Sequence, residues 1–88
     1  MRLVYLRPAF AASKRIHAPA DSPEDRAVMR VVRELADDSR PLPAPGDVET
    51  RLPPSLPCFA RPIPSAGLLV CYAAKGETVF LLAVMRAP

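Results

Sequence analysis

Three arginines in the second half of the chain have the type needed to bind a phosphate group. Arg51, Arg61 and Arg86 carry guanidinium groups, which bind phosphate oxygens through paired hydrogen bonds. Arginine is no proton acceptor near neutral pH, so these three side chains supply no general base. The alternative is that these charges lie at the surface and face solvent or a partner protein.

The other reactive side chains form no pattern typical of a site. His17 is expected in a loop far from Cys58 and Cys71, so we predict no metal site. Cys71 lies in an apolar run and is expected to be buried, whereas Cys58 is expected at an exposed edge, and a disulfide between them is the less favoured alternative. The hydroxyl of Tyr72 is expected at the rim of the core. The chain has no glycine-rich phosphate loop, and we expect no cofactor.

Length and composition restrict the chain to one small domain, residues 1–88. Half of the 88 residues are apolar, which is enough for one compact core but not for a deep substrate cavity. The net charge of +3 comes mainly from arginine and is compatible with a nucleic-acid or acidic protein partner, and also with ordinary solubility. No apolar run approaches the ~18 residues of a membrane span and no signal peptide is visible, so we expect a cytoplasmic protein.

Two helices are predicted, over Pro8–Ile16 and over Asp21–Asp38. The second has a clear start, because Ser22 is a good N-cap and Pro23 suits the first helical position. Apolar residues three and four positions apart predict its buried face: Val28, Val31, Val32 and Leu35. Its opposite face carries three arginines: Arg26, Arg30 and Arg33. We interpret these arginines either as solvated charge or as a contact surface for RNA or an acidic partner.

Prolines separate an irregular connection from the strands that follow it. Eight of the twelve prolines lie between Pro41 and Pro64, and proline lacks the backbone donor that a central strand needs. We therefore predict a packed surface connection over Arg40–Pro57, with a brief extended piece at Asp47–Leu52. Cys58–Ile63 is predicted to be an edge strand.

The last part of the chain predicts an antiparallel sheet. Gly67–Ala74 and Thr78–Met85 are apolar, strand-length runs joined by a tight turn at Lys75–Gly76. Together with the proline-containing strand before them, they form a three-stranded meander. A short strand is predicted over Arg2–Leu6. The order of elements predicts an α+β fold in which the helices gather on one side of one sheet.

This layout and several short motifs resemble the RelE/ParE superfamily of bacterial toxins. Leu35–Pro41 is similar to the family's helix end L-x-x-D-P-R, and Cys58–Ile63 is similar to its first meander strand. Gly67–Tyr72 resembles a strand that reads G-x-R, two hydrophobic residues and Tyr, and Val79–Val84 with Arg86 resembles the apolar last strand. The resemblance covers almost the whole chain and implies the α+β fold described above.

The ribonuclease members of this family cut messenger RNA on the ribosome, and the sequence departs from their catalytic pattern. Leu69 stands where the family has its arginine. Ala60 and Pro62 stand at basic positions of the first meander strand, and no Tyr or His follows the last strand. The resemblance therefore implies the fold more strongly than the nuclease chemistry.

Several functions stay open. The resemblance implies a toxin, or an inactive relative of one, that a partner antitoxin neutralises. Its target would be the ribosome and mRNA or, for a ParE-like member, DNA gyrase. In the ribonuclease case the expected catalytic residues are Glu49, Arg61 and Arg86, with Arg51 binding RNA or a partner. The degenerate pattern favours gyrase or an inactive variant. The alternatives are a non-catalytic interaction domain of the same fold, without toxicity, and an unrelated small α+β domain.

Overall fold

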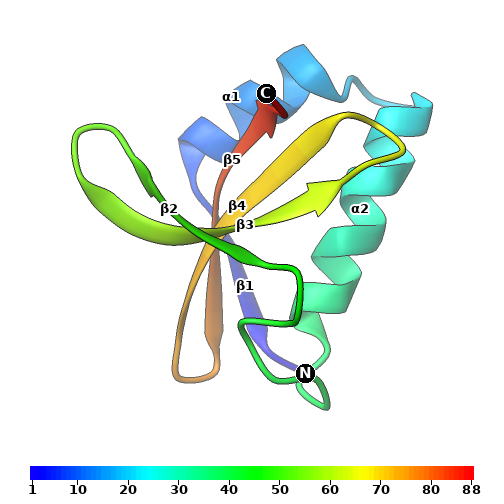
Figure 1. The fold of residues 1–88 in the computed structure, drawn as a ribbon. Coiled ribbons are helices and arrows are strands. Elements are labelled where there is room, and N and C mark those ends of the chain that lie inside the picture. The colour runs from blue at the N-terminus through cyan, green and yellow to red at the C-terminus, as the bar shows by residue number, and fades with distance from the viewer.

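A computed structural model describes all residues, 1–88, as one five-stranded sheet with two helices on one of its faces (Figure 1). The helices are α1 (Pro8–His17) and α2 (Pro23–Ala36), and the strands are β1 (Leu3–Leu6), β2 (Val48–Leu52), β3 (Leu56–Ile63), β4 (Leu68–Lys75) and β5 (Thr78–Arg86). The strand order is β1-β5-β4-β3-β2. β1 pairs with β5 in parallel and the other pairs are antiparallel. The predicted α+β class is confirmed.

Helix α2 begins and ends through contacts that satisfy its terminal backbone groups. The Ser22 hydroxyl accepts a hydrogen bond from the Asp25 backbone N–H at 3.0 Å, and the Asp25 carboxylate accepts one from the Asp21 N–H at 3.0 Å. At the other end the Arg2 guanidinium donates to the carbonyls of Leu35 and Asp37, at 3.3 and 2.7 Å. The predicted N-cap is confirmed, whereas the contribution of Arg2 depends on the tertiary fold.

Helix α1 is tied to its surroundings by two polar contacts. The Ser13 hydroxyl accepts a hydrogen bond from the backbone N–H of Val84 in β5, at 2.9 Å. Lys14 forms an ion pair with Asp25 of α2. The helix runs through His17, so the expectation that His17 lies in a loop is wrong. It ends there because Ala18 precedes Pro19, and the residue before a proline avoids helical geometry.

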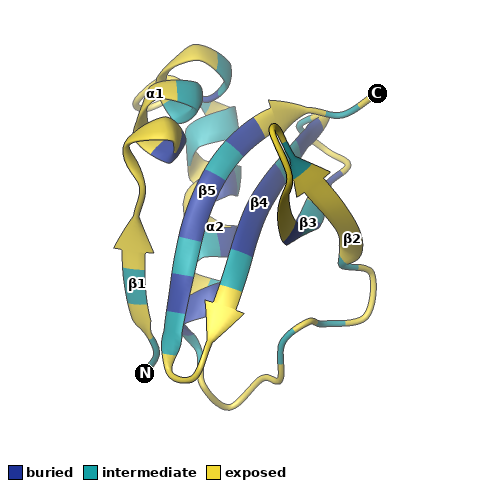
Figure 2. Cartoon of the chain, turned by 90° about the vertical axis from the view of Figure 1, so that its left-hand side faces the viewer, coloured by how far each residue is buried: buried dark blue, intermediate teal, exposed yellow.

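The main core lies between the helices and the sheet. Its buried residues come from both helices, from the segment between them and from the last three strands: Phe10, Ala18, Val28, Val31, Leu35, Ile63, Leu68, Val70, Tyr72, Val79, Leu81 and Val84. In Figure 2 the alternation of buried and more exposed positions is visible along β4 and β5, and α2 lies behind these strands. The predicted buried face of α2 is confirmed at Val28, Val31 and Leu35, and Val32 packs against this core while half-buried.

The position of β3 differs from the prediction. β2 pairs with Leu56–Ala60, so β3 is internal and the edge strand is β2. Pro62 lies past the last residue that β2 pairs, where a missing N–H removes no bond to β2. The extended piece expected near Asp47–Leu52 is thus a full strand of the sheet, which has five strands where the sequence predicted four.

The β4–β5 hairpin has its predicted turn and one irregularity. Gly76 adopts a positive φ of 58°, which glycine tolerates without strain, and it lies in the tight turn between the strands. Cys71 pairs with Ala83 and Tyr72 with Leu81, so Leu82 is an extra residue in β5. Neither helix has the length and apolar character of a membrane span.

Candidate functional site

Arg61, predicted as catalytic, lies against Asp47 of the proline-rich connection. Its Nε and one terminal nitrogen donate to the two carboxylate oxygens of Asp47, at 2.8 and 3.0 Å. Its other terminal nitrogen is 3.5 Å from a carboxylate oxygen of Glu34 in α2. The side chains are little exposed, 2% for Asp47 and 14% for Arg61. A bidentate pair of this kind is directional, and here it joins β3, α2 and the connection.

The Asp47 carboxylate accepts two further hydrogen bonds. The fully buried Tyr72 donates its hydroxyl to Asp47, and the Ala44 backbone N–H donates at 2.9 Å. Burial opposes ionisation of Asp47, but the donors from Arg61, Tyr72 and Ala44 outweigh burial and hold its pKa below the usual value. Burial and the adjacent carboxylate raise the pKa of Tyr72, which keeps its hydroxyl protonated. The expectation that the Tyr72 hydroxyl lies at the rim of the core is wrong, because its acceptor, the Asp47 carboxylate, is itself buried.

Asp47, Arg61 and Tyr72 form a cluster that we call the buried triad, and its role is structural. Three nitrogens of Arg61 already face carboxylates, so few donors remain for a phosphate. The triad holds the start of β2 against β3 and β4. Its arrangement stabilises the path of the proline-rich connection over the sheet.

Glu49 and Arg86 do not join Arg61 in a cluster. Glu49 is exposed on the edge strand β2, opposite Phe59, and forms no ion pair with Arg61. Arg86 is exposed at the end of β5, opposite Leu68 and two strands away from β3. Catalytic groups must converge on one reacting atom. The structure leaves these three residues apart, and their catalytic role stays a prediction.

The predicted partner-binding arginines lie at the surface. Arg51 donates to the Ser55 hydroxyl at 3.3 Å, beside the β2–β3 turn, and Arg26 donates to the Asp21 carbonyl at 3.1 Å. The remaining two, on α2, are exposed and unpaired by carboxylates: Arg30 and Arg33. They are accessible for contact, and contact with RNA or a partner stays a prediction.

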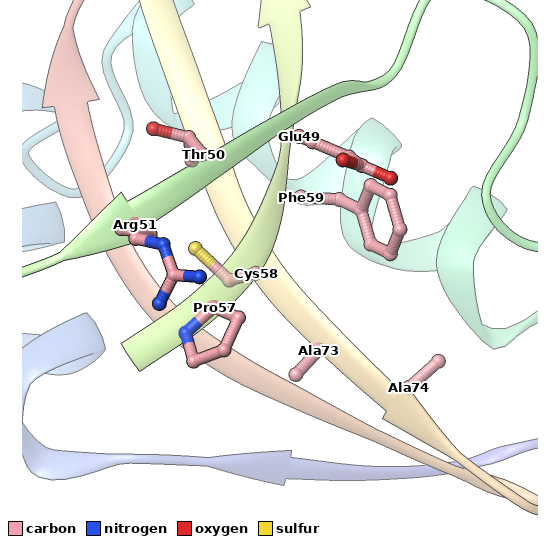
Figure 3. Close-up of a pocket in the computed structure, with 8 residues that line it drawn as sticks. All are labelled: Glu49, Thr50, Arg51, Pro57, Cys58, Phe59, Ala73 and Ala74. Atoms are coloured by element: carbon pink, nitrogen blue, oxygen red, sulfur yellow. The ribbon is translucent and has the colours of Figure 1, made fainter. Parts of the chain in front are cut away.

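A surface hollow of about 700 Å³ lies at the β2 end of the sheet (Figure 3). It is lined by residues of β2, β3 and β4: Glu49, Thr50, Arg51, Pro57, Cys58, Phe59, Ala73 and Ala74. Figure 3 shows Glu49 and its register partner Phe59 pointing to the same side of their strands. Its charged groups, Glu49 and Arg51, are both exposed, so solvent screens them. The hollow therefore lacks the buried polar groups that orient a small substrate.

The face of the sheet turned away from the helices, here called the uncovered face, carries a second apolar cluster. Its buried members are Cys58, Ala60, Cys71 and Leu82. Cys58 is only 6% exposed, so the expectation of an exposed thiol is wrong. The reason is that β2 pairs with this part of β3, which is therefore no edge.

Between the turns that join its strands, the uncovered face carries no charged side chain. Side chains alternate along a strand, and those on this face are Leu3, Tyr5, Val48, Thr50, Leu52, Leu56, Cys58, Ala60, Pro62, Leu69, Cys71, Ala73, Thr78, Phe80, Leu82, Ala83 and Met85. Several are large and exposed: Leu3 68%, Tyr5 56%, Val48 55% and Met85 40%. Exposed apolar surface of this extent is typical of an interaction site.

Sequence reasoning missed Asp47 and the uncovered face for different reasons. Asp47 follows Pro45 and Gly46, a pattern that indicates a turn and gives no sign of burial. The uncovered face had a weak signal, because Val48, Thr50 and Leu52 alternate with charged residues. That alternation indicates a strand with one apolar face, but not which face the helices cover.

The architecture has two helices on one side of a mostly antiparallel sheet. No protein-family model matches the sequence, and comparison with curated proteins finds no match. The structure is similar to a chain from "Chromosomal ParDE TA system from P. aeruginosa", with a TM-score of 0.52 and 14% sequence identity. The likeness covers 100% of this chain and 98% of that one. The two chains share a fold, which agrees with the predicted α+β layout.

Proposed function

We propose that this chain is the toxin-like component of a bacterial toxin–antitoxin pair and that it acts by binding a protein. The observation that carries the proposal is the similarity to a chain of a ParDE toxin–antitoxin system along nearly the full length of both chains. The protein would work in the bacterial cytoplasm, where its targets are.

The arrangement of charges supports binding over ribonuclease chemistry. Cleavage of RNA at the 2′-hydroxyl needs a base, an acid and phosphate-binding groups around one bond. Here Arg61 is engaged by Asp47, and Glu49 and Arg86 lie apart from it. A protein that acts by binding a target needs none of these groups.

An antitoxin is the partner that we assign to the uncovered face. Antitoxin segments fold on binding and bury apolar side chains against the toxin. Val48 is exposed on the edge strand β2 and Met85 is exposed on β5, three strands away, and a segment crossing between them would cover the apolar strands. The exposed arginines of α2 give a further surface for acidic residues of the same partner.

DNA gyrase is the target that we favour, since a ParE-like toxin needs no ribonuclease residues. The second candidate function is a non-toxic interaction domain of the same fold. The exposed apolar area of the uncovered face supports the interaction domain as well as it supports the toxin, because such a surface suits any protein partner. The two functions differ in their effect on a cell.

Expression in a bacterial host without a partner tests the proposal. We expect growth to stop on induction, and the purified chain to inhibit supercoiling by gyrase while leaving ribosome-bound mRNA intact. Normal growth at high soluble yield would reject toxicity and leave the interaction domain. Cleavage of mRNA with gyrase unaffected would reject the target.

A matched set of variants separates binding from catalysis. The exposed substitutions Glu49→Gln and Arg86→Ala should leave growth arrest unchanged if no nuclease site exists. Val48→Lys, which places a charge on the uncovered face beside Glu49, should weaken antitoxin binding. Loss of toxicity in Glu49→Gln alone would indicate that the carboxylate takes part in catalysis.

A further inference from the structure

Strand β2 leaves one edge of the sheet free. It is the last strand in the sheet order, it pairs on one side with β3, and only Leu52 among its residues is partly covered. Figure 2 shows β2 as an exposed ribbon along the side of the sheet. No backbone hydrogen bond outside the sheet involves residues 48–52. Backbone groups left unpaired along such an edge can pair with a strand of another chain.

Two prolines of β3 indicate which backbone groups of β2 are free. In an antiparallel pair, hydrogen-bonded and non-hydrogen-bonded positions alternate. Pro57, opposite Arg51, has no N–H, so Arg51 is at a non-hydrogen-bonded position toward β3, and Glu49, two residues before it, is at another. Pro62, opposite Leu69 of β4, gives the same alternation from the other side of β3. The N–H and C=O groups of Glu49 and Arg51 therefore point outward from the sheet.

We infer that the free edge of β2 pairs with the β2 strand of a second copy of this chain, in an antiparallel dimer whose two-fold axis passes between the two Thr50 residues. The strand reads Val-Glu-Thr-Arg-Leu and is complementary to itself in this register. Glu49 faces Arg51 of the second copy, and the same pair recurs across the axis. Val48 faces Leu52 in the same way. A contact of this symmetric kind closes on two copies.

The charge pairs of this dimer coincide with its backbone hydrogen bonds. Because Glu49 and Arg51 have outward N–H and C=O groups, each Glu49–Arg51 pair exchanges two backbone bonds, with Cα atoms about 5.5 Å apart. Opposite charges at directly opposite positions stabilise strand pairing. Within one chain Arg51 contacts only the Ser55 hydroxyl, at 3.3 Å, and neither charge has an ion pair. Neither side chain must give up a charged partner to form the dimer.

The charges of β2 also disfavour other registers of the same edge. A shift of one residue places outward backbone groups opposite groups that point to β3, so the hydrogen bonds between the copies are lost. A shift of two residues places Glu49 opposite Glu49, or Arg51 opposite Arg51, and like charges directly opposite each other are destabilising. Pro53 and Pro54 follow the strand and offer no N–H to extend the pairing. This match of the strand to itself favours a second copy over an unrelated strand.

The dimer leaves the uncovered face accessible. Side chains that face each other across paired strands lie on the same face of a sheet, so the uncovered faces of the two copies adjoin at Val48 and Leu52. The inference goes beyond the proposed function and does not depend on it. Self-association is measured without a target or an antitoxin, so it can fail or succeed whether or not the chain is toxic.

Sedimentation velocity of the full chain over a range of concentrations tests the contact. We expect conversion of monomer to dimer as concentration rises, and a weaker dimer in added salt because the paired charges are exposed. Glu49→Arg places like charges opposite each other in both pairs and should weaken dimerisation by at least about tenfold. Arg30→Glu, an exposed charge reversal on α2, is the control and should leave it unchanged. A chain that stays monomeric, or a dimer that survives Glu49→Arg, would overturn the inference.

Arg51→Glu gives the complementary variant. Alone it should also be monomeric, because two glutamates then face each other. An equimolar mixture with Glu49→Arg restores opposite charges in both pairs and should form a dimer that holds one copy of each variant. Circular dichroism shows whether each variant is folded. A mixture that stays monomeric although both variants are folded would reject pairing through β2.

Hydrogen exchange provides a second readout on the natural chain. The backbone amides of Glu49 and Arg51 point outward, so their exchange should slow as the chain dimerises. The amide of Thr50 points to β3 and serves as the internal control, with no change expected. Dimerisation without slower exchange at Glu49 and Arg51 would place the contact on another surface and overturn the inference.

Discussion

The two faces of the sheet hold different kinds of groups. The covered face packs against both helices, and beside that core it holds the ion pair of Asp47 and Arg61 with the Tyr72 hydroxyl. The uncovered face carries only uncharged side chains between its hairpin ends, four of them buried and several exposed. The buried charges thus lie on the covered side, where the protein itself supplies the groups that pair with them.

The difference shows how each face is stabilised. A buried charge is tolerated only where several donors meet it, and the covered side supplies them from a helix, a connection and two strands. The uncovered face lacks such neighbours, and its apolar groups gain little until another molecule covers them. We therefore assign stability mainly to the covered face, and the proposed partner contact to the uncovered face.

The largest effect is expected from Asp47→Ala. Removal of the carboxylate leaves the Arg61 guanidinium and the Tyr72 hydroxyl without their acceptor, and breaking a buried pair costs about 3–5 kcal/mol. Urea unfolding measures the loss. Asp38→Ala, which removes an exposed carboxylate, is the control and should change the midpoint little. Equal destabilisation by the two variants would mean that the triad does not stabilise the covered face.

Tyr72→Phe should have the next largest effect. It removes one donor to an ionised carboxylate while keeping the ring, and such hydrogen bonds contribute about 1.5–3 kcal/mol. The matched variant is Tyr5→Phe on the uncovered face, where the side chain is 56% exposed and its hydroxyl makes no hydrogen bond within the protein. Denaturant unfolding should separate the two variants, and identical midpoints would contradict a stabilising role for the Tyr72 hydroxyl.

Stability should also depend on pH through Asp47. Its folded pKa is depressed, so its contribution is present above the unfolded pKa of about 3.9 and is lost as pH falls toward the folded value. Urea midpoints between neutral and strongly acidic pH should therefore fall more steeply for the natural chain than for Asp47→Asn. Parallel curves would show that Asp47 is not linked to folding.

The smallest change in stability is expected from lysine substitutions on the edge strand β2. Val48 and Glu49 are adjacent, exposed and on opposite faces, so Val48→Lys and Glu49→Lys should each change stability by less than about 0.5 kcal/mol. Antitoxin affinity should distinguish them. Val48→Lys is expected to weaken binding about tenfold, and Glu49→Lys is not. Equal affinities measured by calorimetry would place the partner elsewhere.

Local signals explain why parts of the fold were predictable. Helix α2 follows from the Ser22 cap and the apolar spacing, and the β4–β5 turn follows from Gly76, since each depends on residues close in the chain. β3 was misplaced because its neighbour β2 lies in a stretch rich in proline. Whether a strand lies at the edge or inside a sheet depends on which other strands pair with it, and sequence periodicity does not reveal that pairing.

The candidate sites depended on contacts between distant residues. Arg61 could be proposed as a phosphate ligand from its type alone, but the structure pairs it with Asp47, which is 14 residues away, and Tyr72 is 25 residues from Asp47. The order of elements, the α2 helix and the apolar hairpin are determined by local chemistry. Which charges are buried, and which face stays open, is decided by strand order and helix packing, because only these bring distant donors to one carboxylate.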